Sequence, residues 1–368
     1  MNGMQFLNYF KKNFLYKINV RYTTNSKLMI SRIHPLSRLS NFELLRIFSM
    51  LLILIHHFIC HGMNSKLAPP DLIIIVDSFA IIGVNLFLLI SGYFKIRLSW
   101  KSFLNLVFIC MFCKVVHLCT DSFVLGISHP LYEWILKPIF VISRSGGWFV
   151  QVYFMLMFIS PLLNKAIDNL SEKEWKLSLA LLSFISFYLG WILHNYNDAA
   201  GYTLMNFVFI YVIGAAIRHY NLSMRVKTWQ MLFAILLGVV VTFVGSKFIA
   251  AHENLKLGFT AYNSPFVILT ACAVFCIFSK IKLQNKWINK VAVSMLTVYL
   301  LTDGGHLSKV LYGWAGLVDQ NFSEGIVLLL FLIMAVLIIL VVSCLDQIRQ
   351  FIFKRIFRLY ENIIYRTH

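Results

Sequence analysis

Residues 42–62, with the sequence FELLRIFSMLLILIHHFICHG, form an apolar stretch that is long enough for a helix to cross a membrane. The stretch nevertheless contains five ionisable residues, which are Glu43, Arg46, His56, His57 and His61. Ionisable groups are costly in hydrocarbon, so those inside a membrane-spanning helix are functional candidates by default. The stretch therefore predicts both a membrane protein and a place for its chemistry.

The composition extends this interpretation to most of the chain. Of the 368 residues, 59% are hydrophobic and 13% are charged, and the mean hydropathy is +0.76, which excludes an ordinary soluble protein. We expect an all-α membrane protein with about ten transmembrane helices, because its apolar runs have the length that a bilayer requires. The expected spans lie near residues 42–61, 71–92, 102–120, 147–164, 177–194, 203–219, 229–248, 262–280, 288–303 and 324–345. The ninth is short, and the stretch DGGHLSKVLYGWAGL (303–317) that follows either re-enters the membrane or lies on it.

Positive charge orients the predicted helices. The formal net charge is +18. If the N-terminus is cytoplasmic and ten spans alternate, 25 of the 33 Lys and Arg residues fall in cytoplasmic segments and 6 in external loops. This asymmetry follows the positive-inside rule, so we expect both termini in the cytoplasm. The charge then contacts anionic headgroups of membrane lipids and does not indicate a nucleic-acid partner.

Three segments follow from these patterns. They are a basic cytoplasmic N-terminal segment (1–40), a transmembrane domain (41–346) and a basic cytoplasmic tail (347–368). The first lacks the apolar core and the cleavage site of a secretory signal, so we do not expect it to be removed. Met29 is an alternative start. The sequence shows no internal repeat.

The cysteines and histidines do not predict a metal or redox centre. Cys110 and Cys113 have CxxC spacing, but they stand in a membrane helix, where we expect small buried apolar residues. His57 and His61, at i and i+4, resemble a ligand pair, with His56 beside them. The remaining histidines are scattered singly. We therefore expect no metal ion and no disulfide framework.

Arg46 and His57 share one face of the first predicted helix. Eleven steps of about 100° return nearly to the starting direction, and the two residues lie about 16 Å apart along the axis. Glu43 can pair with Arg46 at i, i+3. This face suits a donor whose phosphorylated head enters from the cytoplasm, with acid–base chemistry further across. Alternatively, Arg46 extends to the interface and His57 is a core histidine bonded to a neighbouring helix.

Other polar positions are weaker candidates. Gly92 allows close helix approach, and Ser91 can form a hydrogen bond across helices. Lys95 and Arg97 either hold phosphate or anchor the helix at the cytoplasmic surface.

Two further blocks lie towards the predicted outer side. Trp148 stands at the outer interface, where tryptophan is usually an anchoring residue. Asn263 and Ser264 open the eighth predicted span.

Several blocks, taken in order, resemble the acyltransferase-3 family of integral-membrane enzymes, particularly bacterial enzymes that O-acetylate cell-surface polysaccharides. The blocks are FELLRIFSMLLILIHHF (42–58), GVNLFLLISGYF (83–94), GGWFVQVYFMLMFISPLLN (146–164), YNSPFVIL (262–269) and INKVAVSMLTVYLL (288–301). The arginine of the first block, ten intervening residues and then a histidine make its most specific feature.

The resemblance implies a ten-helix core, acetyl-CoA as the donor and a sugar hydroxyl as the acceptor, often on the outer side of the membrane. His57 matches the essential histidine, Arg46 the essential arginine and Glu43 the acidic residue of the first block. The second-helix signature is matched by Ser91, Gly92 and Tyr93.

One departure from the family pattern concerns the late block. Related sequences often have a histidine just after the VYLL segment, where this chain has Thr302 and Asp303. Either Asp303 or His306 takes its place, or the position is not catalytic here.

We therefore expect a multi-pass, acetyl-CoA-dependent O-acetyltransferase of the bacterial cytoplasmic membrane that modifies a cell-envelope polysaccharide. His57 would be a general base or a transient acyl carrier, and Arg46, oriented by Glu43, would engage CoA. Lys95 and Arg97 would help to hold CoA. Six residues are candidates for binding the glycan or lipid-linked sugar acceptor: Ser91, Tyr93, Trp148, Asn263, Ser264 and Asp303.

Two other classes share some of these features. A transporter or flippase of lipid-linked sugars would also have internal ionisable groups and a basic inner face, but such proteins commonly carry repeats. A glycan polymerase would need a large external loop, whereas the longest predicted here is 121–146.

Overall fold

The computed structural model describes residues 39–63, 69–140, 147–194, 200–252 and 257–366. The chain divides into two units, Met1–Leu39 and Ser40–His368, and every described residue except Leu39 belongs to the second. The predicted basic segment 1–40, up to residue 38, and the alternative start at Met29 lie outside the described residues.

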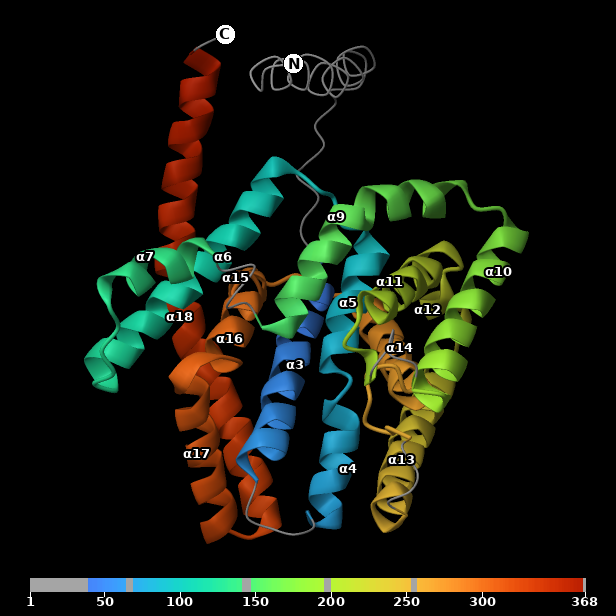
Figure 1. The fold of residues 1–368 in the computed structure, drawn as a ribbon. Helices are drawn as coiled ribbons and strands as arrows, with labels where there is room; N and C mark the ends of the chain where they lie inside the picture. Colours follow the sequence, from blue (N-terminus) through green and yellow to red (C-terminus); the bar gives the residue numbers. More distant parts are fainter. Residues whose placement is uncertain (1–38, 64–68, 141–146, 195–199, 253–256, 367–368) are drawn as a thin grey trace. The chain divides into compact units, whose positions relative to one another are not determined.

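Every regular element in the described residues is a helix (Figure 1). In chain order they are α3 (Ser40–His57), η2 (Phe58–Gly62), α4 (Asp71–Ala80), α5 (Gly83–Phe94), α6 (Trp100–Cys119), η3 (Thr120–Val124), α7 (Leu131–Ile139), α9 (Trp148–Asn169), α10 (Glu172–Ser183), η4 (Phe184–Ile192), α11 (Leu204–His219), α12 (Leu222–Arg225), α13 (Thr228–Ala251), α14 (Pro265–Lys280), α15 (Lys286–Ala292), α16 (Met295–Thr302), α17 (Gly305–Asn321) and α18 (Glu324–Arg366). The elements labelled η are π-helical turns, and each continues the α-helix before it.

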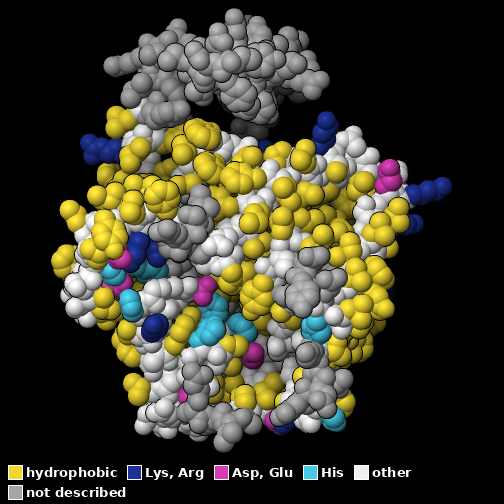
Figure 2. Space-filling view, in the orientation of Figure 1, with side chains coloured by type: hydrophobic (Ala, Val, Ile, Leu, Met, Phe, Trp, Pro, Cys, Tyr) yellow, Lys and Arg dark blue, Asp and Glu magenta, His cyan; other side chains and the backbone are white. Residues whose placement is uncertain are grey.

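The helices are long and apolar enough for a membrane protein. Within the described residues, 7 helical segments meet the length and hydropathy of a span, and α11 and α14 are shorter apolar helices. Figure 2 shows hydrophobic side chains over much of the visible face, most densely in its upper part. The predicted all-α membrane class is confirmed. The number of ten spans and the cytoplasmic position of both termini remain predictions.

The ninth predicted span, 288–303, is not one continuous helix. It is divided into α15 and α16 by a turn in which the Ser294 amide donates to the Val291 carbonyl, 3.0 Å away. The Gly-rich stretch that follows forms most of α17, which packs against η2 and α18. Gly305, with φ of +68°, supplies the left-handed backbone that begins α17.

A buried ion pair on α18 fixes this divided region. Asp346 accepts hydrogen bonds from Ser294 and Thr297, each 2.7 Å long, and pairs with Arg349 at 2.5 Å. The Arg349 side chain is 1% exposed, so this cation of the predicted basic tail is buried in an ion pair. The helix itself continues through the predicted tail to Arg366.

The helix α3 lies within the bundle and contacts α4, α5, α14, α15, α16 and α18 (Figure 1). Beside it, α5 and α11 approach closely, as the glycine in the second-helix block predicts. A β-carbon on Gly92 would lie 2.0 Å from the Tyr211 carbonyl oxygen. The helix α5 also packs against α3, and the two helices carry five of the predicted site residues: Glu43, Arg46, His57, Ser91 and Tyr93.

Candidate functional site

The predicted pair at the start of α3 is present. The Arg46 Nη1 atom lies 2.8 Å from both carboxylate oxygens of Glu43, one helical turn earlier. The Glu43 side chain is only 10% exposed, whereas that of Arg46 is 36% exposed. A buried carboxylate therefore orients a guanidinium that still reaches a solvent-accessible space.

That space is a cavity of about 310 Å³ between α3, α5, α6 and α9. Its polar lining includes Arg46, Ser91, Lys95 and Arg97, all of which the sequence singled out. Lys95 forms an ion pair with Asp168 of α9. Among the described residues, Arg97 forms no ion pair, so its charge is available to a ligand. We call this space the Arg46 cavity.

Part of the lining of the Arg46 cavity is apolar. Its apolar lining consists of Ile90, Phe94, Ile96, Leu106, Ile109, Met157 and Leu296. Tyr153 stands among them, with its hydroxyl 3.4 Å from that of Ser91. A lining that combines cations with apolar side chains matches a ligand with a phosphorylated head and an uncharged arm.

Two residues of the second-helix signature point in different directions. Ser91 lines the Arg46 cavity, but Tyr93 packs its ring against Phe42 and Phe275, at centroid distances of 5.1 and 5.3 Å. The Tyr93 carbonyl accepts a hydrogen bond from Arg218. The structure therefore does not bring Tyr93 together with the other candidates on this helix.

At the other end of α3, His57 is buried among aromatic side chains and is only 8% exposed. Its ring centroid lies 5.6 Å from that of His61 and 6.4 Å from those of Tyr299 and Tyr312. Within the part of the chain that the structure describes, His57 Nδ1 has no hydrogen-bond partner. A buried polar atom without a partner is unusual, so this nitrogen is a candidate for contact with a substrate.

A second cavity, of about 400 Å³, opens beside this group. It is lined by His61 and Gly62 of η2 and by residues of α17 that include Lys309 and Tyr312. A β-carbon on Gly62 would lie 2.5 Å from that of Ala315, so the glycine permits η2 to press against α17. Figure 2 shows histidine side chains gathered in a hollow of the surface.

Trp148 joins the same end of the bundle through ring contacts. Its ring lies 4.5 Å from Tyr202 and 5.6 Å from Tyr262, and the ring of the adjacent Phe149 lies 5.5 Å from Tyr299. Trp148, the first residue of α9, therefore packs among aromatic rings of the bundle.

Asp303 meets the aromatic group beside Gly147. A β-carbon on Gly147 would lie 3.2 Å from both the Asp303 carboxylate and the Tyr299 hydroxyl. His306, the other candidate for the missing histidine, turns away to Asp121, 3.0 Å from its Nδ1 atom. Of the two, Asp303 is the one that the structure places near Tyr299 and therefore near His57.

Asn263 and Ser264 are buried at the start of α14, at 1% and 0% exposure. The residue before them is held by Asn85, whose amide donates to the Tyr262 carbonyl at 2.9 Å. Asn206 donates to the Gly201 carbonyl at 2.9 Å on the neighbouring segment. The sequence reasoning did not single out Asn85 or Asn206, although a buried asparagine in an apolar helix is itself a signal.

Tyr299 and Tyr312 were also missed as neighbours of His57. Tyr299 belongs to the block INKVAVSMLTVYLL, and Tyr312 to the Gly-rich stretch after it. Each tyrosine comes from a helix far along the chain from α3, so spacing within one helix could not place either of them.

Comparison with known families matches residues 39–346 to a model described as an acyltransferase domain, that of the acyltransferase-3 family. No curated protein and no solved structure matches the chain significantly.

Proposed function

This chain belongs to the acyltransferase-3 family, and from that premise we propose that it transfers an acetyl group from acetyl-CoA to a sugar hydroxyl of a cell-surface or exported polysaccharide. Its class as a multi-pass membrane acyltransferase follows from the family and from its apolar helices. The observation that carries the proposal is the Arg46 cavity. It is lined by three cations, Arg46, Lys95 and Arg97, and the first of them lies on α3, the helix that also carries His57.

Acetyl-CoA fits the chemistry of the Arg46 cavity. The phosphates of its nucleotide would contact Arg46, Lys95 and Arg97 at the mouth. The apolar wall would receive the uncharged arm that carries the acetyl thioester. A volume of about 310 Å³ holds only part of this co-substrate, so the nucleotide would extend from the mouth towards the cytoplasm.

His57 would perform the acyl transfer in one of two ways. As a general base, it would take the proton of the acceptor hydroxyl while the oxygen attacks the thioester carbonyl and CoA leaves as the thiolate. As an acyl carrier, its nitrogen would attack that carbonyl first, release CoA and then pass the acetyl group to the hydroxyl oxygen. The unpartnered Nδ1 atom among the described residues is compatible with either role.

The acceptor would approach the opposite end of α3 from the donor. A glycan or lipid-linked sugar would enter beside His57, His61 and Tyr312, where a cavity is present. Trp148 and Asp303 lie on the aromatic group that surrounds Tyr299 and would complete the acceptor site. We place the protein in a bacterial inner membrane, with the acceptor on the outer side.

The experiment follows radiolabelled acetyl-CoA into a panel of bacterial polysaccharides, in membranes that contain matched amounts of wild type, His57→Ala or His252→Ala. His252 is an exposed histidine at the end of α13 and serves as the control. Label with wild type and His252→Ala, but not with His57→Ala, is the expected result.

Each other outcome would show which part of the proposal is wrong. Equal labelling by His57→Ala would remove His57 from the mechanism. Binding of acetyl-CoA without transfer to any glycan would show that the acceptor class is wrong. Absence of acetyl-CoA binding would reject the proposed donor and reopen the transporter alternative.

A further inference from the structure

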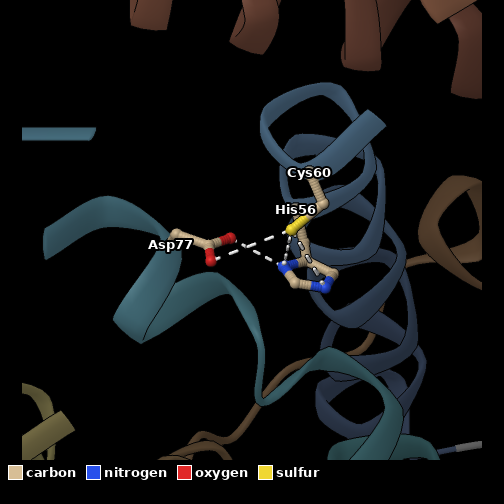
Figure 3. A group of neighbouring side chains, drawn as sticks. All are labelled: His56, Cys60 and Asp77. Atoms are coloured by element: carbon tan, nitrogen blue, oxygen red, sulfur yellow. Dashed lines mark hydrogen bonds and ion pairs between the residues drawn. The ribbon is translucent and has the colours of Figure 1, made fainter. Parts of the chain in front are cut away.

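Three side chains on the other face of the first span form a compact group. They are His56 of α3, Cys60 of η2 and Asp77 of α4 (Figure 3). His56 Nδ1 lies 2.6 Å from an Asp77 oxygen, and Cys60 Sγ lies 3.5 Å from the same nitrogen. The second Asp77 oxygen lies 4.0 Å from the sulfur.

Local backbone geometry brings these groups together. His56 and Cys60 stand at i and i+4, so their side chains overlie one another across the point where α3 becomes the π-helical η2. Asp77 comes from the last turn of α4, which packs against α3. Spacing along the chain could not reveal this trio, because its carboxylate belongs to a different helix from the histidine and the thiol.

The separations resemble those of ligands around a tetrahedral zinc ion. Zinc binds nitrogen at about 2.0 Å and thiolate sulfur at about 2.3 Å, which places a nitrogen and a sulfur about 3.5 Å apart at a tetrahedral angle. The observed distance from His56 Nδ1 to Cys60 Sγ is 3.5 Å. The contact of 2.6 Å between His56 and Asp77 would open by less than about 1 Å to admit the ion.

The charges of the donor set also suit a divalent ion. A thiolate, a carboxylate and a neutral imidazole together carry two negative charges, which a zinc ion cancels. A neutral assembly is favourable where little water is present, and the side chains of His56 and Asp77 are each only 14% exposed. A mixed nitrogen, sulfur and oxygen set is typical of zinc, whereas magnesium and calcium prefer oxygen alone.

We propose that His56, Cys60 and Asp77 bind one zinc ion, with a fourth position open to water on the exposed side of Cys60. The ion would clamp η2 to α4 and so fix the turn that follows His57. The trio lies on another face of α3 from His57, since consecutive residues of a helix point about 100° apart, and the side-chain partners of His56 are Asp77 and Cys60. The inference does not depend on the acetyltransferase proposal.

The test measures metal in the purified full-length protein, prepared with a tag that contains no histidine and then equilibrated with zinc and dialysed. We expect about one zinc ion per chain for wild type, for Cys344→Ser and for Asp71→Asn. Cys344 is another exposed thiol, and Asp71 is another carboxylate of α4, paired with Lys247. Cys60→Ser and Asp77→Asn should bind zinc at least about 100-fold more weakly.

Cobalt gives a second readout that identifies the sulfur. Cobalt-loaded wild type should show the near-ultraviolet absorption of a thiolate bound to cobalt, and Cys60→Ser should lack it. Cys60→His should keep about one metal ion per chain but lose the absorption. This variant shows whether the loss of metal by Cys60→Ser comes from the missing ligand or from misfolding.

Two results would overturn the proposal. One is wild-type protein that holds far less than one zinc ion per chain after equilibration. The other is Cys60→Ser with unchanged metal and unchanged absorption. In either case the trio would be an ion pair of His56 with Asp77 that has a neighbouring thiol.

Discussion

At the start of α3 the polar side chains are charged and paired, whereas at its end the side chains around His57 are mostly aromatic. Arg46 is held by Glu43, and Lys95 is held by Asp168. His57 instead lies among His61, Tyr299 and Tyr312. Paired cations can receive an anionic ligand without large rearrangement, while an imidazole among aromatic rings stays reactive because no fixed ion pair occupies it. The two ends of α3 thus suit different tasks: the Arg46 end suits binding of an anionic ligand, and the His57 end suits the chemical step.

The largest expected effect tests the reactive end. His57→Gln should lower kcat by about 1,000-fold or more, because a base or a nucleophile is lost, and should leave KM for acetyl-CoA nearly unchanged. Initial rates at varied acetyl-CoA, with His252→Gln as the control, check this prediction. A raised KM with normal kcat would mean that the two ends of α3 do not divide their roles in this way.

The second prediction concerns the support for the reactive end. Asp346→Asn should lower the stability of the detergent-solubilised protein by about 3–5 kcal/mol, because it leaves Arg349 buried without a counter-charge. Asp168→Asn breaks a more exposed pair, in which the carboxylate is 61% exposed, and should cost less than about 1 kcal/mol. Thermal unfolding of both variants measures the difference.

A double variant makes the second prediction sharper. Asp346→Asn combined with Arg349→Met should recover much of the loss, because no charge then remains buried. Equal losses for Asp346→Asn and Asp168→Asn would show that burial does not distinguish the two pairs.

The features that follow one helix could be predicted from the sequence. The shared face of Arg46 and His57 and the pairing of Glu43 depend only on the helical repeat. The same repeat explains why the side chains of Ser91 and Tyr93 point to different surroundings, since residues two apart on a helix differ in direction by about 200°. Both residues belong to one sequence block, but the helical repeat alone predicts that their side chains point in different directions.

The features that depend on contacts between distant helices could not be predicted. Tyr299 and Tyr312 reach the His57 end from α16 and α17, and only the fold places Asp303, and not His306, beside Tyr299. The division of the ninth predicted span depends on hydrogen bonds from Ser294 and Thr297 to Asp346 on α18. Hydropathy predicts the length of an apolar segment. It does not show that the Asp346 carboxylate of α18 fixes the turn between α15 and α16.

The third prediction tests the charged end. Arg46→Gln and Arg97→Gln should each raise KM for acetyl-CoA about 10-fold and change kcat little, because one charge-assisted contact with phosphate is lost. Acetyl-pantetheine has no nucleotide phosphates, so the same variants should use it as well as wild type does. Lys173→Gln, an exposed cation of α10 outside the Arg46 cavity, is the matched control. An equal penalty with both donors would mean that these cations do not contact phosphate.

The smallest effect is expected outside the spans, at α7, where a surface network provides a contrast with both ends of α3. Hydrogen bonds from Lys137 and His129 hold the pKa of Glu133 below its ordinary value. A lowered pKa in the folded protein stabilises the fold at pH above the ordinary carboxyl value, and this contribution is lost as the pH falls through the folded value. Glu133→Gln should therefore lower Tm at pH 7 by only about 1 °C, and the difference from wild type should vanish near pH 3. Lys137→Gln should remove most of the same pH dependence, because the first cause of the shift is then absent. A Tm difference that stays constant from pH 7 to pH 3 would show that Glu133 acts through packing and not through its charge.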